Sequence, residues 1–192
     1  MIRLSILICT IPEREKYRKL LDAELNRQID ELGVRGQVEI IYAEEPRGSK
    51  SVGFKRNDNV YKALGLYVIH IDDDDFPANN YLSKIWEAMK SDADIITFNM
   101  NYYESGKYVR KYIINRFIGE SFTESEYIID RIFFHLCAIK RDIANKVKFP
   151  DANFQEDLAY SYEIKPLLKT EHRINECLYN YYFEKELSAT RN

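Results

Sequence analysis

Three short apolar runs alternate with two amphipathic segments at the start of the chain, and this alternation restricts the chain to a small group of folds. Each run is rich in Ile, Leu and Val, which is typical of a strand that is buried on both faces. In the segments between the runs, apolar side chains recur at helical spacing. Strand–helix–strand units place consecutive strands in parallel. The strands are predicted at Leu4–Cys9, Val38–Ala43 and Leu66–Ile71, and the helices at 12–33 and Ser51–Leu64.

The remainder of the chain predicts further strands and helices around this parallel core. The sequence shows neither an internal repeat nor a linker, so the predicted fold class is α/β, an open mixed sheet flanked by helices, in a single domain over residues 1–192. Strands are predicted at Ile95–Asn101, Tyr108–Ile114, His135–Ile139 and Arg173–Tyr182. Helices are predicted at Pro77–Lys90, within Asn115–Arg131, at Arg141–Val147 and at Asp157–Ile164.

The composition is that of a folded domain. The chain has 28 Lys and Arg against 31 Asp and Glu, and a formal net charge of −3. Interleaved charges of both signs argue against intrinsic disorder and against a general nucleic-acid coat. The longest apolar stretches are about half of the ~20 residues that a membrane-spanning helix requires, so we expect no membrane span. Three distant cysteines, Cys9, Cys137 and Cys177, fit buried positions in a reducing compartment, and we expect a cytoplasmic protein.

Four consecutive carboxylates, Asp72 to Asp75, follow directly after the third apolar run. In open α/β sheets, ligands bind outside the carboxyl ends of the strands, so this position is a candidate site. Adjacent carboxylates repel one another unless a cation or solvent relieves the repulsion. Hard oxygen ligands favour Mn²⁺ or Mg²⁺, and Mg²⁺ commonly shares its coordination with substrate phosphates. The sequence therefore predicts a metal-assisted diphosphate site, with a solvated acidic turn as the alternative.

Five segments carry a resemblance to a known family. They are Leu4–Thr10, Gly53–Asn57, Ala63–Gly65, Val68–Asp75 and Gln155–Asp157. Their order and approximate spacing resemble those of family 2 glycosyltransferases with the GT-A fold, and the resemblance covers residues 4–182. It implies a Rossmann-like GT-A sheet in one glycosyltransferase domain. Residues 1–101 would form the nucleotide-sugar donor half, and residues 102–192 the acceptor half with a C-terminal closing segment.

The resemblance implies a role for each matching residue. Asp74 is the expected direct ligand of the metal, and Asp72 is expected beside the donor and the metal. Asp157 is the expected catalytic base, with Glu156 as the neighbour that orients it. Asp75 is expected to reach toward the acceptor or the sugar. The remaining donor-binding residues are expected to be Thr10, Glu44, Arg56, Asn57 and, in the closing segment, Arg191.

The implied reaction is an inverting, metal-dependent transfer of a sugar from a nucleotide-diphosphate sugar to an acceptor hydroxyl. Inversion requires a carboxylate that takes the proton of the acceptor hydroxyl as it attacks the anomeric carbon. Asp157 suits this task because a helix N-terminus keeps its carboxylate ionised. Glu44 stands where the family usually has an aspartate, so the sequence does not identify which base the donor nucleotide carries. His172 is a further candidate for approach to the metal, whereas His70 and His135 are expected to be strand residues.

The acceptor stays open between a glycan, a small molecule and modified DNA. Basic residues gather in the middle of the chain and would favour an acceptor that carries phosphate, so one alternative is a DNA glycosyltransferase that acts on hydroxymethylated bases of phage DNA. Two other classes are a sugar-nucleotide nucleotidyltransferase, although Cys9–Glu15 lacks the glycines of a phosphate loop, and a non-catalytic module that binds nucleotide sugars. The basic residues are Lys107, Arg110, Lys111, Arg116, Lys140, Arg141, Lys146 and Lys148.

Overall fold

A computed structural model of the chain describes residues 1–115 and 128–183. The strands are β1 (Leu4–Thr10), β2 (Val38–Glu44), β3 (Tyr67–Asp72), β4 (Phe76–Pro77), β5 (Ile95–Glu104), β6 (Lys107–Asn115), β7 (Ile128–Ile132), β8 (Ala138–Lys140) and β9 (Glu171–Phe183). The α-helices are α1 (Glu15–Glu31), α2 (Val52–Lys62), α3 (Tyr81–Ala88), α4 (Arg141–Ala144) and α5 (Glu156–Ile164). Short 3₁₀ turns cover Pro12–Arg14, Arg35–Gln37, Met89–Ser91 and Lys165–Leu167.

The described strands form one nine-stranded sheet. Its main path runs β2-β1-β3-β8-β5-β6-β7, while β9 pairs with β5 and the short β4 pairs with β9. β1 is parallel to both β2 and β3, as the alternating sequence pattern predicts. β8 is antiparallel to β3 and to β5, which makes the sheet mixed. The predicted α/β fold with an open mixed sheet is therefore confirmed.

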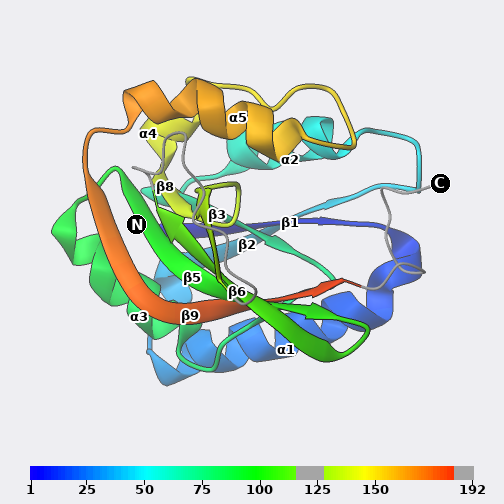
Figure 1. Ribbon diagram of the computed structural model, residues 1–192, viewed down its shortest axis with the longest axis horizontal. Helices are drawn as coiled ribbons and strands as arrows, with labels where there is room; N and C mark the ends of the chain where they lie inside the picture. Colours follow the sequence, from blue (N-terminus) through cyan, green and yellow to red (C-terminus); the bar gives the residue numbers. More distant parts are fainter. Residues whose placement is uncertain (116–127, 184–192) are drawn as a thin grey trace.

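Two groups of helices cover the sheet from opposite sides (Figure 1). α2, α4 and α5 lie on one side, and α1 and α3 lie on the other. Between them, β1 is buried along almost its whole length, because both of its faces meet a layer of helices. Each fully buried Leu or Ile side chain of such a strand contributes about 1.5–3 kcal/mol to stability. The continuous apolar run at the N-terminus is thus the centre of the core.

The three parallel strands end at the same edge of the sheet. The register pairs Thr10 with Glu44 and Cys9 with Asp72, so the last residues of β1, β2 and β3 lie side by side. This edge is the one at which α/β sheets bind ligands, because loops and helix N-termini converge there. The fold therefore delivers the acidic residues that follow β3 to the expected place.

The strand β9 is fastened to the acidic turn after β3. β4 follows that turn and pairs with β9 through Phe76 and Asn180. The backbone N–H of Asp72 donates to the hydroxyl of Tyr179 over 3.1 Å, and the backbone N–H of Tyr182 donates to Asp75 Oδ1 over 2.8 Å. The C-terminal part of β9 consequently forms one wall of the region around the acidic turn.

Two predicted elements differ from the structure. The prediction of a helix within Asn115–Arg131 is wrong at its C-terminal end, because Ile128–Ile132 is the strand β7, which pairs in parallel with β6. Residues 116–127 lie outside the described part of the chain. Isoleucines favour an extended chain beside a strand edge. The strand expected at His135–Ile139 is also shorter, since only Ala138–Lys140 pairs as β8. Before it the chain turns, with the N–H of Cys137 bonded to the carbonyl of Phe134 over 3.1 Å.

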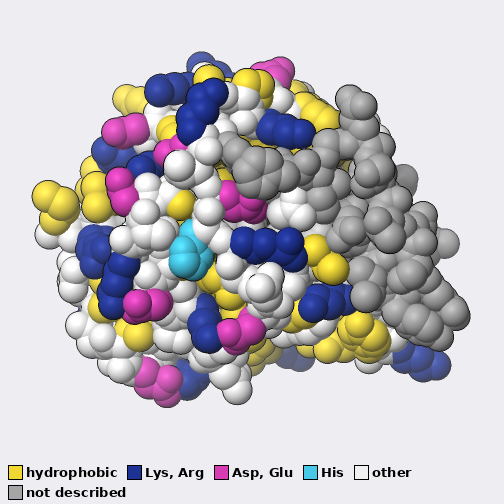
Figure 2. All heavy atoms as spheres, turned by 60° about the vertical axis from the view of Figure 1, so that its left-hand side comes forward, with side chains coloured by type: hydrophobic (Ala, Val, Ile, Leu, Met, Phe, Trp, Pro, Cys, Tyr) yellow, Lys and Arg dark blue, Asp and Glu magenta, His cyan; other side chains and the backbone are white. Residues whose placement is uncertain are grey.

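The structure agrees in part with what the composition predicts for membrane spans, surface charge and buried cysteines. The described residues include no helix that is long and apolar enough to cross a membrane. On the face shown in Figure 2, basic and acidic side chains alternate without an extended patch of one sign. All three cysteines are free, but only Cys137 is buried, while Cys9 and Cys177 are partly exposed.

Candidate active site

The four carboxylates Asp72 to Asp75, at the end of β3 and in the turn that follows, divide into two that reach the surface and two that are buried. The side chains of Asp72 and Asp74 are 28% and 26% exposed, whereas Asp73 and Asp75 are 3% exposed. A turn closed by the N–H of Asp75 and the carbonyl of Asp72, 3.2 Å apart, produces this alternation. Asp72 and Asp74 are therefore the two carboxylates that a ligand can reach most readily.

A hydroxyl group at the end of β1 and a basic group in the turn that follows it hold the acidic turn. Arg14 contacts Asp73 Oδ1 through Nη1 over 2.6 Å and Asp74 Oδ2 through Nη2 over 2.8 Å. The hydroxyl of Thr10 donates to Asp73 Oδ2 over 2.6 Å. Burial, together with the carboxylates of Asp72 and Asp73, nevertheless raises the pKa of Asp74 to about 7. A cation beside Asp74 would relieve this repulsion.

Arg56 links the acidic turn to α5. The helix α2 begins behind Ser51, whose hydroxyl accepts the N–H of Phe54 over 3.0 Å, and Arg56 lies in its second turn. The buried guanidinium contacts Asp72 Oδ1 through Nη2 over 3.1 Å and Glu156 Oε1 through Nη1 over 3.0 Å. Because a guanidinium is planar and always charged, it can fix two carboxylates in one geometry.

Glu156 and Asp157 open α5 on the opposite side of Arg56. The turn into the helix places Gln155 at a φ of 62°, in the left-handed region, and sets both acidic side chains in the first helical turn. Burial opposes ionisation of Asp157, but His135 and Arg56 outweigh it and hold the pKa of this carboxyl below its usual value. Asp157 is therefore an ionised carboxylate near neutral pH.

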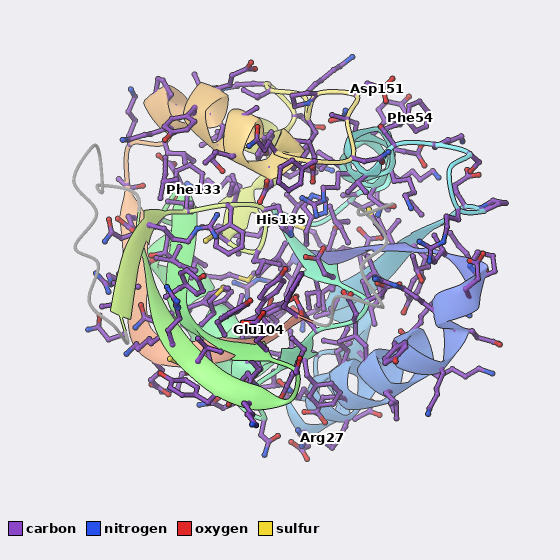
Figure 3. All side chains as sticks on the ribbon, turned by 45° about the vertical axis from the view of Figure 1, so that its right-hand side comes forward. Arg27, Phe54, Glu104, Phe133, His135 and Asp151 are labelled. Carbon is purple, nitrogen blue, oxygen red and sulfur yellow. The ribbon has the colours of Figure 1, made fainter. Side chains whose placement is uncertain are left out.

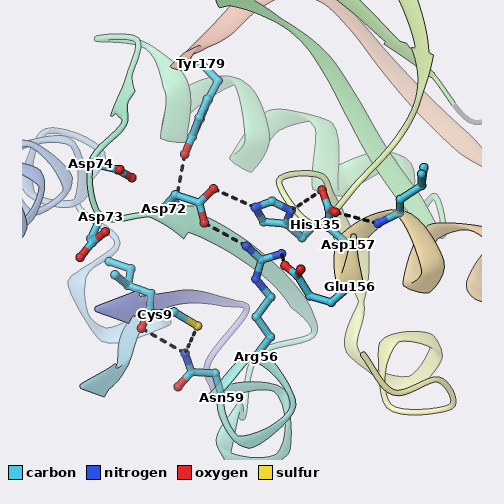
Figure 4. Close-up of polar contacts among 12 residues, drawn as sticks. Cys9, Arg56, Asn59, Asp72, Asp73, Asp74, His135, Glu156, Asp157 and Tyr179 are labelled. Atoms are coloured by element: carbon cyan, nitrogen blue, oxygen red, sulfur yellow. Dashed lines mark hydrogen bonds and ion pairs between the residues drawn. The ribbon is translucent and has the colours of Figure 1, made fainter. Parts of the chain in front are cut away.

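His135 lies between the two acidic groups. Figure 3 shows its side chain inside the molecule, on the connection between β7 and β8. Nε2 is 3.0 Å from Asp72 Oδ2, and Nδ1 is 3.6 Å from Asp157 Oδ2 (Figure 4). Burial and Arg56 lower the pKa of His135, but the two carboxylates raise it more, and the net pKa lies above the usual value.

Two pockets adjoin at this network. The smaller, of about 150 Å³, lies beside the ends of β1 and β3, and the larger, of about 700 Å³, lies beside the start of α5. Thr10, Arg14 and Asp74 line only the smaller pocket, whereas His135 and Asp157 line only the larger. The residues that line both are Arg56, Asp72, Glu156, Tyr181 and Phe183.

The structure thus gathers five of the predicted site residues at the smaller pocket: Thr10, Arg56, Asp72, Asp74 and Glu156. Two others lie elsewhere among the described residues. Glu44 ends β2 beside Thr10 but is 3.6 Å from Arg18 Nε and lines neither pocket. Asn57 bonds the backbone N–H and carbonyl of Phe149, each over 2.9 Å, which ties α2 to the segment before α5.

Three further candidates have different outcomes. Asp75 is buried and bonds the backbone of β9, so it faces neither pocket. His172 pairs with Ile96 near the beginning of β5, and the register from β5 through β8 leads to the first residues of β3, the opposite end from Asp72. His172, which was a candidate for the metal site, therefore lies away from the acidic turn. Arg191 lies outside the described residues.

Sequence reasoning missed three residues of the site. His135 reads as part of an apolar strand, and only the turn before β8 brings it to Asp72. Arg14 lies just after β1, where the carboxyl edge of the sheet indicates a ligand site, but no sequence pattern linked it to Asp73 and Asp74. Tyr181 lines both pockets and stacks on Tyr102 with ring centroids 5.5 Å apart, but it is one of many strand tyrosines in the sequence.

Comparisons with known proteins agree with this fold. The sequence model of the family described as glycosyl transferase family 2 matches residues 25–148. That is well over half of the chain, so the chain belongs to glycosyl transferase family 2. The expected GT-A fold and family are confirmed. No curated protein sequence matches the chain significantly.

Among solved structures, S. aureus TarS has the same fold. TarS residues 1–349 superpose with a TM-score of 0.67 and 16% identity, over 94% of this chain and 60% of that one. The same TarS fragment in complex with UDP superposes with a TM-score of 0.67 and 16% identity, over 96% of this chain and 62% of that one. The complex of this fragment with UDP-GlcNAc superposes with a TM-score of 0.66 and 16% identity, over 96% of this chain and 59% of that one. The chain spans about 60% of the length of the TarS fragment.

Proposed function

We propose that this glycosyltransferase moves a sugar from a nucleotide-diphosphate sugar to an acceptor hydroxyl, with inversion at the anomeric carbon. The observation that carries the proposal is the shared wall of the two pockets, with Asp74 on one side and Asp157 on the other. A transferase needs two substrates to meet at one point, and adjoining pockets provide that point. The complexes of TarS with UDP and UDP-GlcNAc support a nucleotide-sugar donor.

The two halves of the chain contribute unequally to the two pockets. Most residues that line the smaller pocket belong to residues 1–101, and most that line the larger belong to residues 102–192. We assign the donor to the first and the acceptor to the second, within a single domain over residues 1–192. Thr10 and Arg56 lie where they could contact the donor.

Asp74 and Asp72 fit a divalent cation of the Mn²⁺ or Mg²⁺ type. Burial and adjacent carboxylates raise the pKa of Asp74 to about 7, and a cation would relieve that cost. In the described part of the chain, no group of three His, Cys, Asp or Glu side chains is arranged to hold a metal. Mg²⁺ typically uses one or two carboxylates with phosphates in the rest of its shell. When bound, such an ion neutralises charge that develops on the departing diphosphate.

Asp157 fits the role of general base. Its side chain is 24% exposed, faces the larger pocket and is held in the ionised form. The carboxylate takes the proton of the acceptor hydroxyl while the oxygen bonds to the anomeric carbon and the bond to the diphosphate breaks. A carboxylate of low pKa suffices, because the hydroxyl becomes acidic only as the new bond forms. Glu156 is held by Arg56 next to this base.

A thermal-shift panel of nucleotide sugars with and without Mn²⁺ tests the proposal without knowledge of the acceptor. A ligand that binds the folded state at 100 times its Kd stabilises it by about 2.7 kcal/mol. We expect one nucleotide sugar to raise Tm, with a larger rise when Mn²⁺ is present. Release of free nucleoside diphosphate should then be followed with that donor. Absence of stabilisation by every nucleotide sugar would contradict the proposed donor class.

A further inference from the structure

His135 is the only described residue that contacts both Asp72 and Asp157. Its Nε2 lies 3.0 Å from Asp72 Oδ2, and its Nδ1 lies 3.6 Å from Asp157 Oδ2 (Figure 4). Both ring nitrogens therefore face a carboxylate oxygen. One carboxylate belongs to the wall that both pockets share, and the other belongs to the larger pocket alone.

The imidazole is held in this orientation by its surroundings. The side chain is 6% exposed, and its ring packs edge-on against Phe134 and His70, with centroids 5.5 and 6.2 Å away. The carbonyl of His135 also accepts the N–H of His70 over 3.4 Å, which fastens the turn to β3. A ring fixed in this way can transmit the position of one carboxylate to the other.

Asp72 is the fixed end of this link. Its Oδ1 contacts Arg56, and its backbone N–H donates to the hydroxyl of Tyr179. Asp157 has fewer such contacts, because within residues 1–115 and 128–183 its carboxylate otherwise accepts only the N–H of the next residue, Leu158, at Oδ1 over 2.8 Å. Without His135, the Asp157 side chain would lose the contact that relates it to the acidic turn.

We propose that His135 is a positioning residue that sets the carboxylate of Asp157 relative to the donor end of the site. This inference rests on the proposed function. A general base must lie within hydrogen-bond reach of the hydroxyl that it deprotonates, and a displacement of ~1 Å can cost ~10²-fold in rate. A carboxylate has about four lone-pair sites. The contacts with His135 and Leu158 therefore leave Asp157 able to accept a proton from an acceptor.

Three substitutions separate this role from packing. His135→Ala removes both contacts. His135→Asn places an amide group where Nδ1 stood and can keep the contact with Asp157. His135→Gln places its amide where Nε2 stood and can keep the contact with Asp72. His172→Ala is the control, since it removes an imidazole at the end of the sheet opposite Asp72 and leaves the rings that pack against His135 in place.

We expect His135→Ala to lower kcat by about 10- to 100-fold, the loss typical of removing a group that orients a reacting residue. The KM for the donor should change by less than about threefold, because the donor contacts remain. His135→Asn should retain more kcat than His135→Gln. His172→Ala should keep kcat within about threefold of wild type, even where Tm falls.

The pH profile provides a readout that packing would not move. Burial and Glu156 favour protonation of Asp157, whereas His135, Arg56 and Arg131 favour its ionised form. Loss of the imidazole should therefore shift the acid-side fall of kcat/KM to higher pH. The control His172→Ala should leave that limb in place.

The outcomes distinguish this inference from the proposed function. If the wild-type protein turns over no nucleotide sugar, the proposed function fails and the role of His135 fails with it. If the wild type is active, a kcat of His135→Ala within about threefold of wild type overturns the positioning role alone. A loss without a shift of the acid limb, or with Asn no better than Gln, also overturns it. Tm measurements on all four variants show whether each is folded.

Discussion

Gly53 and Pro150 bring two distant segments into backbone contact. A Cβ atom added at Gly53 would lie 1.8 Å from the carbonyl oxygen of Pro150, closer than any side chain tolerates. The N–H of Gly53 also donates to the carbonyl of Ala152 over 3.0 Å. This approach joins the beginning of α2, which carries Arg56, to the segment that leads into α5. The distance between the two charged elements of the site therefore depends on a glycine.

Gly53→Ala should destabilise the protein and reduce transfer. The added methyl meets backbone, which cannot rotate away, so we expect a cost of at least about 1–3 kcal/mol in the free energy of unfolding. The displaced segment precedes Asp157, so kcat should fall as well. Gly36→Ala is the control, because no described atom beyond its two chain neighbours lies within 4 Å of its added Cβ. Equal urea denaturation midpoints for the two variants would contradict the assigned contact.

The sequence was sufficient to predict the parts of the fold that depend on local pattern. The apolar runs at β1, β2 and β3 predicted the parallel core, because strands that are buried on both faces require such runs. The helical spacing of apolar residues between these runs predicted α1 and α2. The same reasoning placed Asp72 and Asp74 at the carboxyl edge of the sheet. To predict these features, it is enough to know where each strand lies, which way it runs and which strands are beside it.

Contacts between distant segments could not be predicted in this way. His135 reaches Asp72 because the chain turns just before β8, and its apolar neighbours Phe134 and Leu136 suggested a strand instead. Asp75 and Asp74 are adjacent in sequence, yet a tight turn buries one and exposes the other. The pairing of β7 with β6 likewise depends on tertiary structure, which overrides local preference.

Asp157→Asn should abolish most transfer while donor binding persists. The amide has nearly the same shape but cannot take a proton, so we expect kcat to fall by about 10²–10⁴-fold. The thermal shift caused by the donor should be retained, because Asp157 lines only the larger pocket. Asp142→Asn is a matched control, as Asp142 also lies in the first turn of a helix but is 89% exposed. Wild-type rates for Asp157→Asn would refute the base assignment.

Asp74→Asn should weaken the response of the enzyme to Mn²⁺. The substitution removes a carboxylate whose pKa is raised to about 7 by burial and by its acidic neighbours, so the apo fold should keep its Tm or gain slightly. The extra stabilisation that Mn²⁺ gives with a donor should be lost, and transfer should fall with it. Asp30→Asn, at a side chain 59% exposed, serves as the control. Full wild-type activity in the presence of a chelator would exclude the metal role.

Arg56→Met should destabilise the fold, chiefly through the buried carboxylate of Glu156. The guanidinium is 6% exposed and contacts both Asp72 and Glu156, so its removal takes the cation away from Glu156, also 6% exposed, and leaves Asp72 with its contact to His135. Loss of one member of a buried ion pair costs about 3–5 kcal/mol. Arg35→Met is the control, since its ion pair with Asp30 is exposed and such pairs contribute about 0–1 kcal/mol. Similar chemical denaturation curves for the two variants would show that the Arg56 network is not structural.

Asp94 should make the stability of the fold depend on pH, independently of the site. Its Oδ2 accepts the N–H groups of Lys169 and Thr170 over 2.7 and 3.0 Å, which fastens the turn before β9. Burial raises the pKa of Asp94, but these N–H groups and Lys140 lower it more, and the net pKa lies below the usual value.

A carboxyl whose pKa is lower in the folded state stabilises the fold fully above its unfolded pKa of about 3.9, and that contribution is lost as the pH falls through the folded pKa. We therefore expect Asp94→Ala to cost about 1–3 kcal/mol at pH 7, the usual cost of leaving two N–H groups without their acceptor. The difference from wild type should shrink below about pH 4, where the wild-type carboxyl begins to protonate. Asp92→Asn is the control. Asp92 lies two residues before Asp94 and also contacts Lys140, but its side chain is 86% exposed. Unfolding midpoints from pH 3 to pH 7 test this, and a difference that stays constant over that range would contradict the lowered pKa.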